Sequence, residues 1–215
     1  MPQDGSRDPI AGPDSGPAPP FPLRLNGKVI KGFGRGSSEL GIPTANIPID
    51  GLSVGGNKDL ESGIYFGWAG LSTSDATNAH PPGTKGKYEL MKADIYDDLT
   101  AKMQQHAAPD TSSSHGAVYP MVMSVGFNPY YNNTVRSVEV HIMHDFQVNF
   151  YETHMNLIVL GFIRGEADYT TKEALIDDIK TDIDVSGRSL GRREYLSFAK
   201  DPYLTEFSGR SEIAS

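Results

Sequence analysis

The sequence predicts an all-β protein, a small closed barrel of six short strands with an α-helix near the C-terminus. From Leu23 onward, glycine and proline separate short runs in which apolar and polar residues alternate, as in half-buried strands. Outside one insertion, a helical period is seen only late, between Ala174 and Ile183. Six strands of this length are enough to close a small barrel.

The predicted elements can be assigned in chain order. Each strand is bounded by glycine, proline or a polar loop. The six predicted strands are residues 27–31, 45–49, 63–71, 117–127, 136–143 and 157–164. The predicted helix follows the possible cap residues Thr170 and Thr171, and its apolar residues recur at helical spacing: Ala174, Leu175, Ile179 and Ile183. We expect this helix to pack on the barrel.

The remaining segments give the domain organisation. Residues 1–22 are rich in proline, glycine and aspartate, so we expect a disordered N-terminal tail. Residues 23–200 form the predicted barrel domain, and residues 201–215 form a C-terminal tail. Residues 72–116 interrupt the strand pattern and are predicted to be an insertion between two strands.

One amphipathic helix is predicted inside the insertion, within residues 88–106. Its apolar residues are spaced four apart: Met91, Ile95, Leu99 and Met103. Because long surface loops cost little free energy, we expect a tolerated surface insertion far from the chemistry. Deleting it behind a short linker would then leave turnover largely intact.

Composition restricts the class of function. Hydrophobic residues make up 38% of the 215 residues, which is enough for one cored domain. The formal charge of −8 argues against a nucleic-acid surface, and the absence of cysteine excludes disulfides and thiolate zinc sites. No signal-peptide pattern and no apolar run that would span a bilayer is present. We therefore expect a cytoplasmic protein, with an organellar pool left open.

The strongest chemical signal runs from Gly32 to Asn46, with the sequence GFGRGSSELGIPTAN. Glycines allow backbone N–H groups to converge on an anion. The Thr44 hydroxyl and the Asn46 carboxamide, two residues apart on one face of a predicted strand, suit a hard cation that also binds phosphate. This stretch is a candidate phosphate and magnesium site.

Two familiar phosphate loops do not fit this stretch. A Walker A loop needs Lys and Ser or Thr after its second glycine, where this chain has Ile42 and Pro43. A dinucleotide-binding fingerprint needs a helix where residues 45–49 alternate like a strand. From the residues alone, a glycine-rich hairpin loop without a ligand is about equally well supported.

A second block resolves this choice by resemblance. Residues 32–46, followed by Ser124–Tyr131 (SVGFNPYY) and Arg136–His144 (RSVEVHIMH), resemble in order the two signatures of the riboflavin kinase family, of the eukaryotic monofunctional type. The resemblance runs from about Leu23 to Leu190. It implies a closed Greek-key-like barrel that transfers the ATP γ-phosphoryl group to riboflavin, giving FMN and ADP. It also implies Mg²⁺, with Zn²⁺ or Mn²⁺ as alternatives, and we expect a monomer.

The resemblance also implies the site residues. Glu139 matches the catalytic base, and Thr44 and Asn46 match the metal positions. The expected ATP contacts are Lys31, Gly32, Gly34, Arg35, Gly36, His144 and Tyr151, and the expected riboflavin contacts are Asn132, Arg136, Ser137 and Arg164. Two departures from the family pattern are Ser38, where some relatives carry a basic residue, and Gly165, where proline often follows the arginine.

Strand periodicity supports the role of Glu139. Alternation places Glu139 on one face with Ser137 and His141, and Val138 and Val140 on the other. A carboxylate held rigidly by an apolar core can orient a hydroxyl and accept its proton. A solvated strand glutamate is the ordinary alternative without the resemblance.

Other functions are less well supported. A histidine metal site is disfavoured, because His141 and His144 face opposite sides of a strand and no recognised zinc motif includes His154. The alternative to an enzyme is a non-catalytic flavin- or nucleotide-binding barrel module. A bifunctional FAD-forming enzyme would need a second domain ahead of Leu23, where we expect only the tail.

Overall fold

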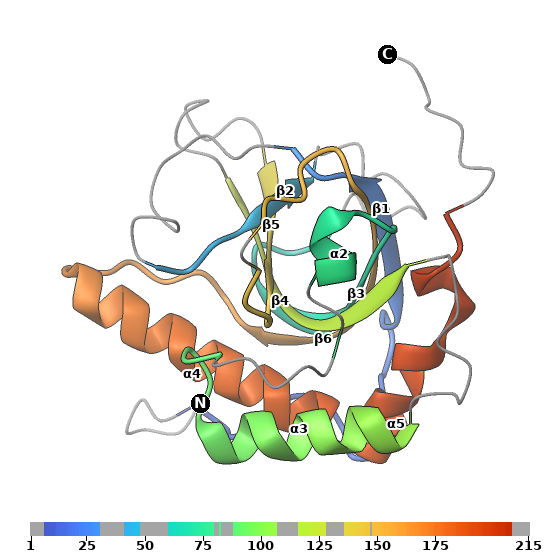
Figure 1. Cartoon of the computed structure of the whole chain (residues 1–215). Helices are drawn as coiled ribbons and strands as arrows, with labels where there is room; N and C mark the ends of the chain where they lie inside the picture. The colour runs from blue at the N-terminus through green and yellow to red at the C-terminus, as the bar shows by residue number, and fades with distance from the viewer. Residues whose placement is uncertain are drawn as a thin grey trace.

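The computed structural model describes residues 7–30, 41–47, 60–79, 82, 88–106, 116–127, 136–146 and 148–207. Six antiparallel strands form one strongly curled sheet in the order β1-β6-β3-β4-β5-β2 (Figure 1). The strands are β1 (Leu23–Lys28), β2 (Ala45–Ile47), β3 (Gly63–Leu71), β4 (Ala117–Phe127), β5 (Arg136–Ile142) and β6 (His154–Arg164). Strands β3, β4 and β5 form a meander and β6 returns beside β3, which is a Greek key.

The first and last strands of the sheet barely meet. Among the described residues, one isolated bridge, Ile30 to Asn46, joins the chain after β1 to β2, with an Ile30 N–H to Asn46 C=O bond of 2.9 Å. The closed barrel expected from the sequence is therefore not confirmed; the sheet is a half-barrel with this single link. Asn46 is thereby paired with Ile30 on one side of the opening and with Glu139 of β5 on the other.

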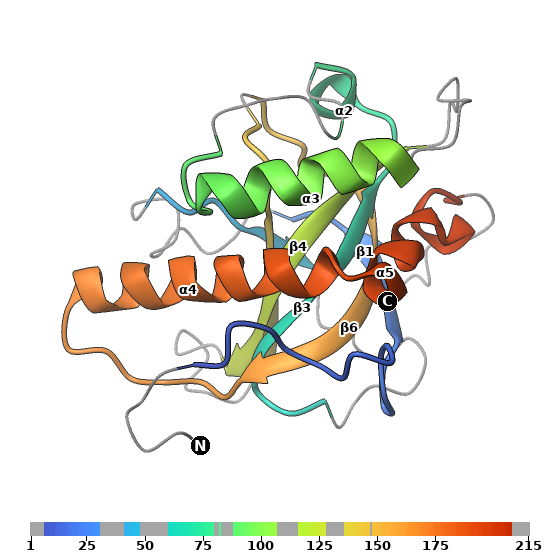
Figure 2. The same ribbon diagram turned by 90° about the horizontal axis from the view of Figure 1, so that it is seen from below.

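Most helices cover the outer face of the sheet. They are α3 (Ala93–His106), α4 (Lys172–Leu190), α5 (Arg193–Leu196), and the short 3₁₀ helices η3 (Ser197–Lys200) and η4 (Pro202–Leu204). The short helix α2 (Asp75–Ala79) lies instead at one end of the curl (Figures 1 and 2). Figures 1 and 2 show α3 and α4 side by side against one face of the strands. Within the described residues, no helix combines the length and the hydropathy that a membrane span requires.

Alternation along the strands produces two cores. Inside the curl lie residues such as Leu25, Tyr65 and Val140. The outward residues Phe66 and Trp68 pack with α3, α4 and the C-terminal helices. Both Trp68 and Tyr65 are at most 1% exposed, so these aromatic side chains belong to the cores.

Element boundaries agree with the sequence where both strand partners are clear from the pattern. Strands β3 and β4 have the predicted limits, and Thr171 caps α4 through its hydroxyl, which accepts from the Ala174 N–H at 3.1 Å. Strand β1 begins four residues before the predicted start, because Leu23 pairs with Val159 of β6. Pairing partners extend strands beyond their local signals.

The insertion, residues 72–116, is not the peripheral surface segment that the sequence predicted. The predicted helix forms as α3, but Met91, Ile95 and Leu99 are only 4%, 6% and 2% exposed, in the core shared with the sheet and α4. A Cβ placed on Gly187 of α4 would lie 2.8 Å from Ile95 Cγ2, so glycine lets the helices approach closely. The segment containing α3 is therefore an integral layer of the fold.

The expected tails also differ from the prediction. Residues 7–22 have no regular structure but are held against α4 and α5: the Arg192 guanidinium donates to the Gly12 carbonyl and Tyr195 Oη to the Pro13 carbonyl, both at 2.9 Å. At the other end, Tyr203 Oη donates to the Leu25 carbonyl at 2.8 Å, and Leu204 is fully buried. Backbone carbonyls provide contacts that composition does not reveal.

Arg7 is expected to contribute to stability through α4. It pairs with Asp178 and Asp182, and the Asp182 side chain is only 3% exposed. Arg7→Ala should lower the free energy of unfolding by about 1 to 2 kcal/mol, between the values for exposed pairs and for broken buried pairs, since Arg164 still pairs with both carboxylates. Urea unfolding measures this. Arg24→Ala, which breaks the more exposed pair with Asp201, is the control and should cost less.

Candidate active site

Glu139 lies in the middle of β5, between two neighbouring strands. It is opposite Asn46 of β2 on one side and Ser124 of β4 on the other. Its neighbours Val138 and Val140 are buried inside the curl, so the Glu139 side chain is on the outer face, as alternation predicted. Burial raises the pKa of the Glu139 carboxyl, and no ion pair with a described residue offsets that effect. A partly desolvated carboxylate of this kind is suited to accepting a proton.

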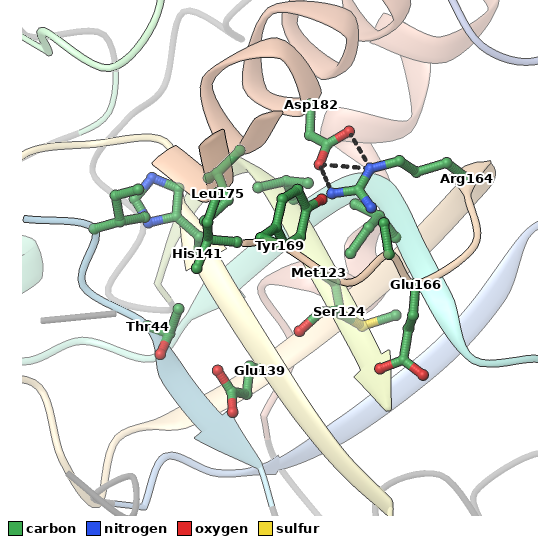
Figure 3. Close-up of a pocket in the computed structure, with 15 residues that line it drawn as sticks. Thr44, Met123, Ser124, Glu139, His141, Arg164, Glu166, Tyr169, Leu175 and Asp182 are labelled. Carbon is green, nitrogen blue, oxygen red and sulfur yellow. Dashed lines mark hydrogen bonds and ion pairs between the residues drawn. The ribbon is translucent and has the colours of Figure 1, made fainter. Parts of the chain in front are cut away.

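A pocket of about 220 Å³ contains Glu139 (Figure 3). It lies between the outer face of the sheet and the first turns of α4, whose Leu175 and Ile179 form part of the apolar wall. The polar side chains at its edge include Thr44, Ser124, Glu139 and Tyr169. A mainly apolar slot with a few convergent polar groups is typical of sites for small ligands with a flat ring.

A second pocket of about 100 Å³ lies beside the first and also includes Thr44. Its aromatic wall is built by Phe146, Phe150 and Tyr151, and Tyr151 is 45% exposed. The His144 ring packs 4.9 Å from the Phe146 ring, between centroids. Thr44 therefore belongs to both linings, with outward residues such as Glu139 in the larger pocket and inner-core residues such as Val140 in the smaller one.

Alternation places Thr44 and Asn46 on the same side of the sheet as Glu139, although only Thr44 lines the pockets. The intervening Ala45 belongs to the inner core, so the two polar side chains point outward. Asn46 is 6% exposed and sits across the ladder from Glu139, where facing Cβ atoms are about 4.5 to 5.5 Å apart. A hydroxyl and a carboxamide oxygen are suitable donors for Mg²⁺ when phosphate oxygens and water complete the shell.

Arg164 lines the larger pocket but is bound to carboxylates of α4. Its Nη2 donates to Asp182 at 2.7 Å (Figure 3) and lies 2.9 Å from an Asp178 oxygen. Burial acts to lower the pKa of Arg164, but the hydrogen bond and charge of Asp182 outweigh it and the net shift is upward. Arg164 therefore fastens the pocket wall to α4, a role that sequence reasoning missed.

The other predicted site residues fall into three groups. His144 and Tyr151 line the smaller pocket, as a shared nucleotide role requires. Ser137 lies on β5 beside Gly126, outside the lining of both pockets, and the side chain of Arg136 is not described. Lys31, Gly32, Gly34, Arg35, Gly36 and Asn132 lie outside the described residues.

Some pocket residues were not predicted. Ser124 is the first residue of the second signature block, and strand alternation with buried Val125 would have placed it outward beside Glu139. Tyr169 and Asp182 come from the loop before α4 and from α4 itself, and no local pattern marks them. Glu166, two residues after Arg164, adds a third carboxylate to the pocket lining, beside Glu139 and Asp182.

Known proteins share both sequence and architecture with this chain. The riboflavin kinase family model matches residues 19–190. A riboflavin kinase of Pyricularia oryzae is 46% identical over 89% of this chain and 82% of its own length, and one of Chaetomium globosum is 46% identical over 93% and 85%. The crystal structure of riboflavin kinase from Trypanosoma brucei superposes with a TM-score of 0.55 at 23% identity, covering 91% of this chain and 92% of that one, which supports the fold. The chain belongs to the riboflavin kinase family.

Proposed function

We propose that this chain transfers the γ-phosphoryl group of ATP to the 5′-hydroxyl of riboflavin, forming FMN and ADP. The observation that carries the proposal is the position of Thr44, which lines the pocket holding Glu139 and also the aromatic pocket beside it. A two-substrate transfer needs two adjoining binding sites with a shared boundary. Family membership adds the identity of the two substrates.

The larger pocket is the proposed riboflavin site. Its apolar wall, including Ile64, Val122 and Ile179, suits the flat flavin ring, and Ser124 and Tyr169 offer hydrogen bonds. Asn132, Arg136 and Ser137 remain proposed contacts of the ribityl chain. We assign Arg164 to the wall of this pocket, where its bonds to Asp182 hold the surrounding segment to α4.

The smaller pocket is the proposed nucleotide site, with Tyr151 and His144 beside the base or sugar. The glycine loop, with Lys31, Gly32, Gly34, Arg35 and Gly36, is proposed to bind the phosphates through backbone N–H groups and cations. Thr44 and Asn46 would hold Mg²⁺, which when bound offsets the charge on the β- and γ-phosphate oxygens. A monomeric state and a cytoplasmic location remain further proposals.

Glu139 performs the proton transfer in this proposal. Its carboxylate accepts a hydrogen bond from the riboflavin 5′-hydroxyl and orients that oxygen toward the γ-phosphorus. As the new O–P bond forms, the hydroxyl proton passes to Glu139, and the bond to the β,γ-bridging oxygen breaks with its electron pair leaving on ADP. Glu139 then returns the proton to solvent.

The direct test is an FMN assay with the full chain. Riboflavin, ATP and Mg²⁺ together should give FMN and ADP in equal amounts, detected by chromatography, and omission of any one should abolish the product. A non-catalytic flavin- or nucleotide-binding module would instead bind the same molecules and yield no FMN. Replacing Mg²⁺ with Zn²⁺ or Mn²⁺ in the same assay ranks the metals.

Thr44→Val is expected to weaken Mg²⁺-dependent ATP binding. The change removes the hydroxyl but keeps the β-branched shape. Loss of a group that only orients a metal ligand typically costs roughly ten- to hundredfold in affinity, so loss of a ligand oxygen should cost at least that much. Calorimetric titration of ATP with and without Mg²⁺ measures the difference. Thr44→Ser, which keeps the hydroxyl, is the control. An equal loss of riboflavin binding in Thr44→Val would point to misfolding and against metal ligation.

A further inference from the structure

His141 connects the site to a distant part of the chain. It lies two residues after Glu139 on the same face of β5, and its side chain is only 4% exposed. Nδ1 lies 2.7 Å from the Pro43 carbonyl oxygen, and Nε2 lies 2.5 Å from the Tyr88 hydroxyl. Both ring nitrogens are therefore occupied, one by the residue before Thr44 and one by a residue of the insertion.

The protonation pattern of these bonds follows from the partners. A carbonyl oxygen only accepts, so Nδ1 carries the proton and donates to Pro43. Burial lowers the pKa of His141 to about 4, which keeps the ring neutral and leaves Nε2 as an acceptor. Burial also raises the pKa of Tyr88, so its hydroxyl stays protonated and donates to Nε2. The order of donation is Tyr88 to His141 to Pro43.

This bond fixes a carbonyl that the sheet leaves out. The β2–β5 ladder begins at Ala45 opposite Val140, so Pro43 precedes the paired residues. The His141 side chain supplies its carbonyl with the donor that a strand neighbour would otherwise give. The Pro43 carbonyl and the Thr44 nitrogen belong to the same peptide unit. The hydrogen bond from His141 therefore restrains the orientation of that peptide, and with it the direction of the Thr44 side chain, which lines both pockets.

Tyr88 is itself held in place by packing against α3. Its side chain is 7% exposed, and its ring lies 5.8 Å from the Tyr96 ring of α3 and 5.9 Å from the His141 ring, between centroids. Helix α3 is joined to α4 where the Lys92 N–H donates to Asp184 Oδ1 at 2.9 Å. The chain of contacts therefore begins in packed helices and ends at the peptide before Thr44.

We propose that Tyr88 is a positioning residue of the phosphoryl-transfer site, acting through His141 to hold the Pro43–Thr44 peptide in the geometry that presents the Thr44 hydroxyl. This inference rests on the proposed metal role of Thr44. It assigns to the insertion a function in catalysis, since a group 53 residues away in sequence from His141 sets the position of the metal-binding strand. Small errors in such geometry are costly to transfer reactions.

The test compares Tyr88→Phe with Tyr96→Phe in the full chain. Tyr88→Phe keeps the ring stack but removes the donor to His141, whereas Tyr96→Phe removes a neighbouring hydroxyl of the same aromatic cluster. We expect Tyr88→Phe to weaken Mg²⁺-dependent ATP binding roughly tenfold, the lower end of what loss of a partner that orients a metal ligand costs, and to change riboflavin affinity less. Tyr96→Phe should leave both affinities as in the parent. Equal behaviour of the two variants would overturn the proposal.

A second measurement is independent of activity and of the Thr44 assignment. In ¹⁵N-labelled protein without ligands, the His141 ring should show the Nδ1–H tautomer, and Tyr88→Phe should shift the Nε2 resonance toward that of an acceptor without a donor. An unchanged Nε2 resonance would overturn the proposed hydrogen bond from Tyr88 to His141. If Thr44→Val leaves Mg²⁺-dependent ATP binding intact, the assignment of Thr44 as a metal ligand fails instead. The His141 Nε2 resonance still reports on the hydrogen bond from Tyr88 in that case.

Discussion

Glu139→Gln is expected to lower kcat for FMN formation by roughly 10²- to 10⁴-fold, the usual contribution of a positioned general base. The amide has the shape of the carboxyl group but does not accept the hydroxyl proton. Riboflavin and MgATP should still bind, because Glu139 lies on a strand fixed by buried Val138 and Val140. Rapid-quench measurement of FMN, with separate titration of each substrate, tests both halves of the expectation.

The control for Glu139→Gln is Glu173→Gln. Glu173 is an exposed carboxylate in the first turn of α4, outside the lining of both pockets. The same chemical change there should leave kcat near the parent value. If Glu139→Gln forms FMN at the parent rate while binding both substrates, Glu139 is not the base.

The raised pKa of Glu139 gives this test a pH signature. The base acts as a carboxylate, so kcat should fall as the pH falls through a pKa above the ordinary glutamate value. This acid limb should vanish from the residual rate of Glu139→Gln. A parent profile that stays flat down to the ordinary pKa of glutamate would contradict the burial of the carboxylate.

The same pKa shift implies a cost in stability. A carboxyl group whose pKa is raised on folding favours folding at low pH, and that contribution is lost as the pH rises through the folded-state value. At neutral pH the buried charge is therefore destabilising, and the neutral amide of Glu139→Gln should raise the Tm slightly. A variant that is more stable and nearly inactive would indicate that the charge is retained for chemistry.

Local sequence patterns were sufficient to predict the placement of site residues that depends on strand alternation. The outward placement of Glu139, Thr44 and Asn46 follows from the inward placement of their apolar neighbours, and periodicity shows both. The two signature blocks then supplied the chemistry. The pairing of Asn46 with Glu139 across β2 and β5 joins the blocks, and no single segment of sequence contains that contact.

Long-range partners account for what could not be predicted. The riboflavin contact of Arg164 stays a prediction, but the sequence did not reveal its carboxylate partner Asp182, which lies on another element, 18 residues away. His141 shares its face with Glu139, yet the Pro43 carbonyl it binds is 98 residues away. The composition of the N-terminal segment predicts disorder because most of its anchoring groups are backbone carbonyls, which every sequence has, and the partners of its Arg7 side chain lie far away on α4.

The insertion shows the same limitation more clearly. The four-residue spacing of its apolar side chains predicted a helix correctly, but a helical stripe does not reveal which surface covers it. In the structure the cover is the outer core of the sheet and α4, including Phe66, Trp68 and Ile183. A segment that is peripheral in sequence order is therefore central in packing.

Removal of the insertion is expected to prevent folding, contrary to the tolerance expected from sequence. Leu71 pairs with Ala117, so a short turn replacing residues 73–115 could join β3 to β4 without disturbing the ladder. The deletion would nevertheless uncover Phe66, Trp68 and the apolar face of α4. We expect the product to be insoluble or to lack a cooperative unfolding transition.

Leu99→Ala provides a graded version of this prediction. Leu99 is 2% exposed in the outer core, and a buried leucine truncated to alanine typically costs about 2 to 5 kcal/mol. That is a large share of the about 5 to 15 kcal/mol that holds a typical domain folded. Lys102→Ala, on the exposed side of the same helix in a pair with Asp98, should cost less than about 0.5 kcal/mol. Similar unfolding midpoints for both variants would contradict a role of α3 in stability. A large difference would show that the insertion belongs to the core that supports the kinase site.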